Sequence, residues 1–291
     1  MSFVPAGILL RAAQKGGYAV GAFNCSNMEI MQAIVRAARL ENAPVIIQVS
    51  QGAIKYAGLD YLVAMAKVAV REASVPAALH LDHGTEIDVV LACLKAGFSS
   101  VMFDGSKLPL EENIALTRQV VKAAREAGAS VEAELGRIGG TEDEVSVEDK
   151  EAFFTDPEEA RYFVERTGVD ALAVAVGTAH GRYKGEPKLD LERLARIAGL
   201  VGIPLVLHGA SGVPGGAVQE AIKRGVRKIN IDTDIRQRFV DTIRRRLDEE
   251  PAEIDPRKIL GPAREAAVEV VREKIRLFGS SKRAGQGNPV K

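Results

Sequence analysis

The chain has 291 residues, enough for one large domain or two small ones. Hydrophobic residues make up 46% and charged residues 27%, a balance typical of a globular protein with a sizeable core. The formal net charge is zero, so no polybasic surface indicates nucleic acid or a membrane as partner. No apolar run approaches a membrane span or a signal peptide, and Cys25 and Cys93 are too few for a disulfide framework. These features predict a cytoplasmic protein.

Short apolar runs rich in β-branched residues alternate along the chain with longer stretches of helical periodicity. Several of the runs are apolar along most of their length, as expected of parallel strands covered on both faces. The predicted strands span residues 20–24, 45–50, 77–83, 100–106, 130–136, 171–177, 203–209 and 227–233.

Helix signals lie between these strands; Asp156, for example, opens a helix that Gly168 ends. Eight strand–helix units with parallel strands predict a (β/α)8 TIM barrel, a single α/β domain over residues 1–291. An open doubly wound sheet is the alternative, but the glycine fingerprint usual after its first strand is missing. An extra C-terminal helix over about 262–278 is expected outside the barrel, followed by a flexible tail at 280–291.

All four histidines of the chain stand at or near the end of a predicted strand. The carboxyl ends of barrel strands form the active site, and neutral imidazole is the commonest protein ligand for a divalent transition metal. His83, His180 and His208 therefore predict a three-histidine metal site with an open position for substrate. His80 lies three residues before His83 on the same strand, and we expect it to be hydrogen-bonded inside the barrel.

Carboxylates occur at neighbouring positions. Asp82 lies next to His83 at the end of the same predicted strand. Its carboxylate could act as a general base beside an electrophile, or it could orient a histidine. Asp104 and Glu134 end two further strands, where they would support the ligands or form a weaker second metal site. The glycine-containing, acidic segment 135–151 is either a solvated loop or a mobile lid that carries Glu142 into the closed site.

Glycine-bearing segments follow the last two strands, HGASG at 208–212 and NIDTD at 230–234. In such barrels these loops often bind phosphate through backbone N–H groups. Ser211 and Thr233 add hydroxyl donors, and Lys184 adds positive charge after the sixth strand. Tight turns also explain the glycines, so their position in the fold supports the phosphate prediction more than their presence does.

The segments HLDHG, VEAELG, GGTED, GTAHGRYKG, VLHGASG and KINIDTD occur in one order from about Ala22 to the DPRKILGPAR segment. In this the chain resembles the class II, metal-dependent fructose-1,6-bisphosphate aldolases and the related tagatose-bisphosphate aldolases. The resemblance implies a lyase of glycolysis and gluconeogenesis. It would cleave fructose 1,6-bisphosphate reversibly to dihydroxyacetone phosphate and glyceraldehyde 3-phosphate through a metal-stabilised enediolate. It also implies catalytic Zn²⁺, with Co²⁺, Mn²⁺ or Fe²⁺ as substitutes, and Na⁺ or K⁺ on the phosphate side.

Carried over residue by residue, the resemblance makes His83, His180 and His208 the zinc ligands and Asp82 the base. Glu142 becomes the acid/base of the lid, and Asn230 helps to hold the enediolate. Asp232 favours fructose over tagatose, although the GSKLPLEEN stretch looks tagatose-like. The substrate and phosphate contacts expected are Asn24, Ser50, Gly181, Lys184, Gly209, Ser211, Asp232, Thr233 and Arg257.

Three other functions compete with this interpretation. A lysine Schiff base, with Lys184 as the candidate, would leave three histidines unexplained. Metal-dependent hydrolases on this barrel typically begin with an HxH pair at the first strand, which here ends in Asn24. A non-catalytic sugar-phosphate-binding accessory subunit would be expected to have lost Asp82 or a histidine. The family likeness also implies a homodimer or homotetramer, whereas the zero net charge and the lack of a long apolar run predict no nucleic acid or membrane as partner.

Overall fold

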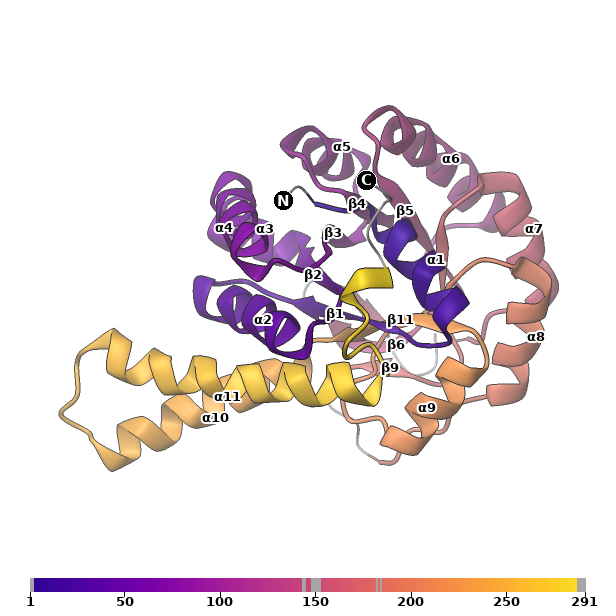
Figure 1. The fold of residues 1–291 in the computed structure, drawn as a ribbon. Coiled ribbons are helices and arrows are strands. Elements are labelled where there is room, and N and C mark those ends of the chain that lie inside the picture. The colour runs from indigo at the N-terminus through magenta and orange to yellow at the C-terminus, as the bar shows by residue number, and fades with distance from the viewer. Residues whose placement is uncertain (1–2, 143–144, 148–152, 182, 184, 287–291) are drawn as a thin grey trace.

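The computed structural model describes residues 3–142, 145–147, 153–181, 183 and 185–286, and within them eight parallel strands close into a barrel (Figure 1). Strands follow one another around the ring in chain order, and the last pairs with the first. The TIM-barrel prediction is therefore confirmed. The barrel strands are β1 (Val20–Asn24), β2 (Val45–Ser50), β3 (Ala77–Gly84), β4 (Ser100–Phe103), β5 (Ser130–Leu135), β8 (Ala171–Val174), β10 (Leu205–Leu207) and β11 (Val226–Ile231).

Helices surround the barrel and bury its outer apolar face (Figure 1). Their ends follow ordinary capping chemistry. The Asp156 side chain accepts hydrogen bonds from the N–H groups of Glu158 and Glu159 at the start of α7, and Gly168 ends it at φ 69°, as predicted. The helices are α1 (Ala6–Gly16), α2 (Met28–Glu41), α3 (Gln51–Ala57), α4 (Leu59–Ala73), α5 (Ile87–Ala96), α6 (Leu110–Glu126), α7 (Pro157–Thr167), α8 (Leu191–Val201), α9 (Gly215–Lys223), α10 (Thr233–Glu249) and α11 (Pro256–Leu277).

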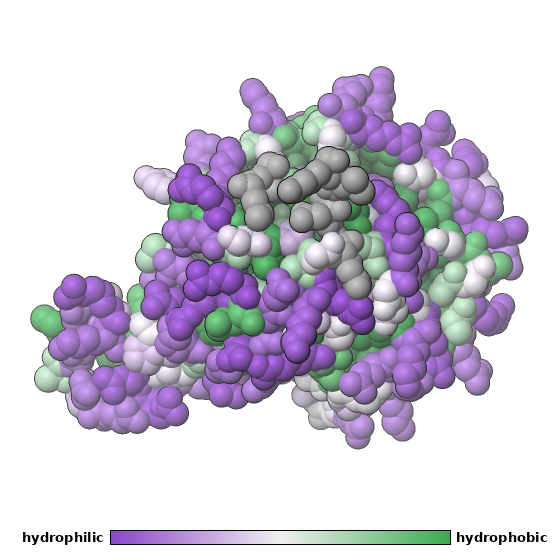
Figure 2. All heavy atoms as spheres, viewed as in Figure 1, coloured by the Kyte–Doolittle hydropathy of each residue, from purple (hydrophilic) through white to green (hydrophobic). Residues whose placement is uncertain are grey.

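Helices α10 and α11 form an antiparallel arm that extends beyond the barrel (Figure 1). The predicted C-terminal helix begins earlier than expected, at Pro256. Asp255 caps its N-terminus, and the first position of a helix accepts proline because no N–H is needed there. This face of the arm is largely hydrophilic, with apolar atoms at its outer end (Figure 2). There Ile254, in the turn between the two helices, is 89% exposed.

The segment after α11 differs from the flexible tail expected at 280–291. Ser280 is fully buried, and the N–H groups of Lys282 and Ala284 donate to the carbonyls of Glu41 and Asn42 at 2.8 and 3.0 Å. A short 3-10 helix spans Ala284–Gln286, and residues 287–291 lie outside the described part of the chain. The start of the predicted tail is therefore attached to the end of α2.

Glu41 makes this attachment and provides a test of stability. Its carboxylate accepts hydrogen bonds from Arg272 Nε (2.9 Å), Arg276 Nη2 (2.6 Å) and Ser281 Oγ (2.8 Å). Burial opposes ionisation, but these three donors outweigh it and lower the pKa of Glu41 from 4.5 to about 2. Because the folded pKa is depressed, this stabilisation is present above about pH 4.5 and is lost as the pH falls through about 2.

We expect Glu41→Gln to lower the free energy of unfolding by roughly 1–3 kcal/mol at pH 7, since hydrogen bonds to a charged group are lost. Urea unfolding at several pH values measures the effect, and the gap from wild type should narrow below pH 4.5. Glu265→Gln is the matched control: it removes an exposed ion pair with Arg36 between the same two helices and should cost less than about 1 kcal/mol. A gap that stays constant down to acid pH would contradict the role of the carboxylate charge.

A second, small sheet lies beside the barrel and has the order β7-β6-β9. Its strands are β6 (Gly139–Glu142), β7 (Val145–Val147) and β9 (Ala179–His180). Strands β6 and β7 form an antiparallel hairpin inside the segment 135–151, which the sequence predicts only as a loop or lid. Among the described residues, no helix is both long and apolar enough to cross a membrane.

Candidate metal centre

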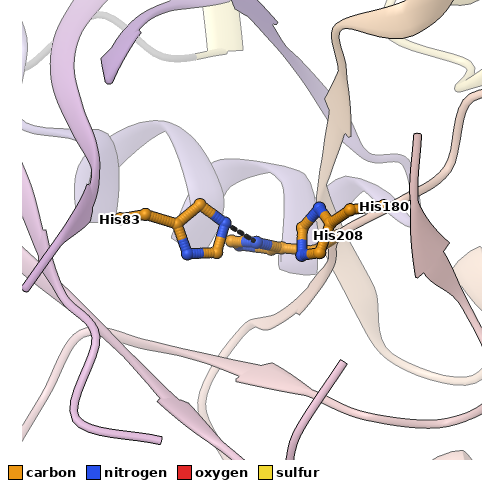
Figure 3. A group of neighbouring side chains, drawn as sticks. All are labelled: His83, His180 and His208. Atoms are coloured by element: carbon orange, nitrogen blue, oxygen red, sulfur yellow. Dashed lines mark hydrogen bonds between the residues drawn. The ribbon is translucent and has the colours of Figure 1, made fainter. Parts of the chain in front are cut away.

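Three histidines from different parts of the chain converge at the carboxyl ends of the strands (Figure 3). His83 ends β3, His180 lies on β9, and His208 follows β10. Each is at most 6% exposed, and one nitrogen from each ring lies within 4.8 Å of the other two. His208 Nδ1 and His83 Nε2 are 3.0 Å apart. Zinc–nitrogen bonds of 2.0–2.1 Å in a tetrahedral site separate ligand nitrogens by about 3.3 Å, so the rings fit a metal of that kind.

The backbone at His83 explains how neighbouring residues reach one site. His83 has a left-handed φ of 47°, and the pairing of β3 with β4 shifts register between Leu81 and Gly84. A non-glycine residue in this conformation costs of order 1–3 kcal/mol, and such strain is common at functional sites. The irregularity allows Asp82 and His83, which a regular strand would point to opposite faces, both to face the site.

Two glycines bring His180 to the other histidines. Gly209 has φ 61°, and a Cβ on it would lie 2.4 Å from the carbonyl oxygen of Ala179. Gly140, in β6, has φ 94°, and its Cβ would lie 2.2 Å from the carbonyl oxygen of His180. Both positions therefore require glycine, because they allow β9 to pack between β6 and the loop after β10.

Two buried carboxylates orient the rings. His83 Nδ1–H donates to Asp104 Oδ2, and His208 Nε2–H donates to Glu132 Oε1, both at 2.9 Å. These bonds leave His83 Nε2 and His208 Nδ1 directed at each other. A carboxylate that accepts from the other ring nitrogen is the usual partner of a metal-binding histidine. Asp104 thus accepts a hydrogen bond from one of the predicted ligands.

The charges around the rings favour a cation. Burial alone lowers the pKa of His83, but the Asp82 carboxylate and the hydrogen bond to Asp104 outweigh it and raise that pKa well above its ordinary value. Burial, together with Asp104, raises the pKa of Glu134 well above its usual range. His83, Asp104 and Glu134 also form a second group with ligand atoms within 4.8 Å of one another. Excess negative charge in a buried space is what a divalent ion would neutralise.

Asp82 is fully buried and is held by amide donors from three strands. Asn24 Nδ2 donates to its Oδ2 at 2.8 Å and Asn230 Nδ2 to its Oδ1 at 3.2 Å. Gln48 Nε2 lies 3.3 Å from Oδ2 and donates to Asn24 Oδ1 at 2.8 Å. These bonds fix the orientation of a carboxylate next to the histidines, as a general base requires.

The predicted phosphate loops also come together. Ser211, in the loop after β10, accepts a hydrogen bond from the N–H of Asp234 in the first turn of α10 (3.3 Å). Thr233 begins that helix, and Asp232 pairs with Arg236 at 2.7 Å. Gly181 directly follows His180. The loops after β10 and β11 are therefore neighbours beside the histidines.

The remaining predicted residues lie at varying distances from the histidines. Ser50 is paired with Asp82 between β2 and β3, and it also caps α3 by accepting from the N–H of Ala53. Arg257 lies in the first turn of α11, with a side chain 90% exposed and paired with Asp255 at 2.7 Å, and the structure does not bring it to the histidines. Glu142 ends β6, but its side chain is outside the described part of the structure, and Lys184 lies outside the described residues.

His80 is inside the barrel as predicted, with Nδ1 2.8 Å from Ser100 Oγ. Three interior residues were missed: Gln48, Glu132 and Lys228, which are at most 2% exposed. The two-residue period of a strand could have revealed two of them, because residues two apart point to the same face. Glu132 stands two residues before Glu134, and Lys228 stands two residues before Asn230.

The chain is similar to known proteins over most of its length. The model of the family "Fructose-bisphosphate aldolase class-II" matches residues 5–283. A fructose-bisphosphate aldolase of Thermus caldophilus is 50% identical over 299 residues, covering 95% of this chain and 98% of that protein. One of Geobacillus stearothermophilus is 47% identical over 289 residues, covering 98% and 100%.

Solved structures agree as well. The YdjI aldolase from Escherichia coli K12 has a TM-score of 0.86 at 33% identity and covers 97% of this chain and 99% of its own. A putative fructose-1,6-bisphosphate aldolase from Coccidioides immitis has a TM-score of 0.88 at 35% identity and covers 95% and 96%. With the three histidines and Asp82 in one buried site, the chain thus belongs to the metal-dependent class II fructose-bisphosphate aldolase family.

Proposed function

We propose that this aldolase holds Zn²⁺ on His83, His180 and His208 and cleaves fructose 1,6-bisphosphate reversibly to dihydroxyacetone phosphate and glyceraldehyde 3-phosphate. Fructose-bisphosphate aldolase activity, a carbon–carbon lyase reaction, follows from the family and its named relatives. The observation that carries the proposal is the convergence of three buried imidazoles beside a buried carboxylate. An all-imidazole set suits zinc, although Co²⁺, Mn²⁺ and Fe²⁺ accept the same ligands.

When bound, the ion supplies a Lewis acid that stabilises negative charge developing on the substrate oxygens. Asp82 is the proposed base: in the condensation direction it removes a proton from the carbon beside the ketone of dihydroxyacetone phosphate, and in the cleavage direction its protonated form donates a proton to that carbon. Its three amide neighbours keep the carboxylate aimed at one position. Glu142 is the proposed acid that protonates the alkoxide formed from the aldehyde in the condensation direction and the proposed base that deprotonates the same hydroxyl in the cleavage direction. Asn230 lies against Asp82, where its amide can also contact the enediolate.

The loops after β10 and β11 are the proposed phosphate site. Backbone N–H groups and hydroxyls are available there as donors to a phosphate, from Gly181, Gly209, Ser211 and Thr233. Lys184 is the proposed cationic side chain, and a bound Na⁺ or K⁺ would add further positive charge. Asp232 is the proposed reason for a preference for fructose over tagatose bisphosphate. We expect faster turnover of the fructose epimer in a side-by-side assay with metal analysis of the same sample. Equal or faster turnover of tagatose 1,6-bisphosphate would reverse the assignment.

The homodimer or homotetramer is also a proposal. Arg257 is the proposed contact for the second phosphate, yet it lies on the projecting arm (Figure 1). In such an assembly a second copy of the chain would bring Arg257 to a site. Light scattering of wild type and Arg257→Ala, together with the KM of each, tests both points.

Chelation tests the use of metal. We expect EDTA treatment followed by its removal to abolish cleavage, and stoichiometric Zn²⁺ to restore it, because the described histidines and carboxylates supply no other electron sink. Coupled detection of glyceraldehyde 3-phosphate measures the rate, with magnesium addition as the control for ion specificity. Cleavage that survives chelation, or borohydride inactivation in the presence of substrate, would favour a lysine Schiff base instead. A chain that binds the bisphosphate but never cleaves it would be an accessory subunit.

A further inference from the structure

A line of buried charge runs from β11 through β5 to the histidines. Lys228 Nζ lies 2.8 Å from Glu132 Oε2, and His208 Nε2 lies 2.9 Å from Glu132 Oε1. Lys228 and His208 are fully buried, and Glu132 is 2% exposed. The three residues come from separate strands or strand ends, so the barrel itself sets their spacing.

Glu132 determines which nitrogen of His208 can bind an ion. A carboxylate can only accept a hydrogen bond, so Nε2 carries the proton and the lone pair is on Nδ1. That Nδ1 lies 3.0 Å from His83 Nε2, on the side where the three histidines meet (Figure 3). The hydrogen bond to Glu132 therefore selects the tautomer and the orientation that a ligand at this place needs.

Lys228 in turn determines the orientation of Glu132. Among the described residues, the other side-chain nitrogen paired with Glu132 Oε2 is His80 Nε2, at the longer distance of 3.6 Å. The Glu134 carboxyl group also interacts with the Glu132 carboxylate, so without Lys228 the Glu132 side chain would face another acidic group with no cation beside it. Burying an ion pair does not usually stabilise a fold more than apolar residues would, so stability alone gives little reason for this pair.

We propose that Lys228 and Glu132 are positioning residues of the aldolase, which hold His208 with Nδ1 directed at the metal. Lys228 acts only through Glu132. This inference rests on the three-histidine centre proposed above.

Metal affinity measured against a chromophoric chelator tests the inference without any turnover. We expect Lys228→Met and Glu132→Gln each to bind Zn²⁺ about 10–100-fold more weakly than wild type, the usual loss when a partner of a ligand is removed. The double variant should be no weaker than the weaker single variant, because both changes break one line of contacts. The visible spectrum of the Co²⁺ protein should shift in each single variant, since the His208 ring is no longer held.

Glu41→Gln is the matched control, because it also removes a buried carboxylate paired with cationic side chains, but at the junction of α2 and α11. It should lose stability while its zinc affinity and cobalt spectrum stay those of wild type. A purely structural role for Lys228 and Glu132 predicts the same pattern for their variants. Wild-type affinity and spectrum in both single variants would therefore overturn the inference, as would a double variant whose losses add.

If Lys228→Met fails to fold, the near-isosteric Glu132→Gln variant provides the test. Zn²⁺ affinity equal to wild type in Glu132→Gln would then overturn the inference. Failure of the centre itself looks different. His208→Ala that keeps stoichiometric metal would remove His208 from the ligands. His208→Ala that loses metal, combined with unchanged Lys228 and Glu132 variants, would leave the centre intact and reject only the positioning role.

Discussion

Asp82→Ala is expected to keep its metal and to lose cleavage of fructose 1,6-bisphosphate by about 10²–10⁴-fold, the usual loss when a general base is removed. The carboxylate is fully buried and is held by Asn24, Gln48 and Asn230. A base from the solvent therefore cannot easily replace it. Exchange of the dihydroxyacetone phosphate proton with solvent isolates the step, because it requires abstraction but no aldehyde. That exchange should fall as far as cleavage does.

Asp88→Ala is the matched control, since Asp88 is an exposed aspartate in the first turn of α5, shortly after β3. It should exchange protons and turn over as wild type does. If Asp82→Ala retained rapid proton exchange and lost only cleavage, another residue would have to be the base. Loss of metal along with activity would instead make Asp82 a support for the ligands, the alternative that the sequence leaves open.

His208→Ala is expected to lower bound zinc from about one ion per chain to a small fraction after dialysis, and activity with it. Removing a direct ligand should cost more than the 10–100-fold in affinity that loss of an outer partner costs. It also leaves the buried Oε1 of Glu132 without its 2.9 Å donor, while Oε2 keeps its pairing with Lys228. Metal analysis of the purified variant, with circular dichroism to verify folding, measures the result.

His80→Asn is the control for that variant, because His80 is equally buried and bonds to Ser100 rather than to the other rings. It should keep stoichiometric zinc. Metal retained in His208→Ala but lost in His80→Asn would exchange the roles of the two residues and contradict the proposed ligand set.

Much of this architecture is predictable because the barrel repeats one simple pattern. Apolar strands buried on both faces, helices with clear caps, and histidines placed at strand ends define the ring and the edge at which chemistry occurs. The predicted strands 100–106, 171–177 and 203–209 run past the observed ends at Phe103, Val174 and Leu207. There the chain leaves the ladder, and on two of these strands it carries Asp104 and His208 into the site.

Other features depend on contacts between distant residues, which periodicity does not encode. The left-handed His83 and its register shift are set by tertiary packing, and β9 is too short for any pattern to reveal. Lys228 and Glu132 stand in strands whose apolar neighbours conceal them, and each is tolerable only because the other is present. The roles of Glu142, Lys184 and Arg257 rest on family resemblance and stay predictions, as do the cytoplasmic location and the oligomeric state.

The division of the histidines between two sheets has a consequence for how this centre can be observed. His83 and His208 belong to the frame of the barrel, whereas His180 is carried by β9, whose backbone partner is the hairpin strand ending in Glu142. A metal ion held by all three rings would therefore be bound across the two sheets. The visible spectrum of the Co²⁺ protein would change if β9 were displaced relative to the barrel strands.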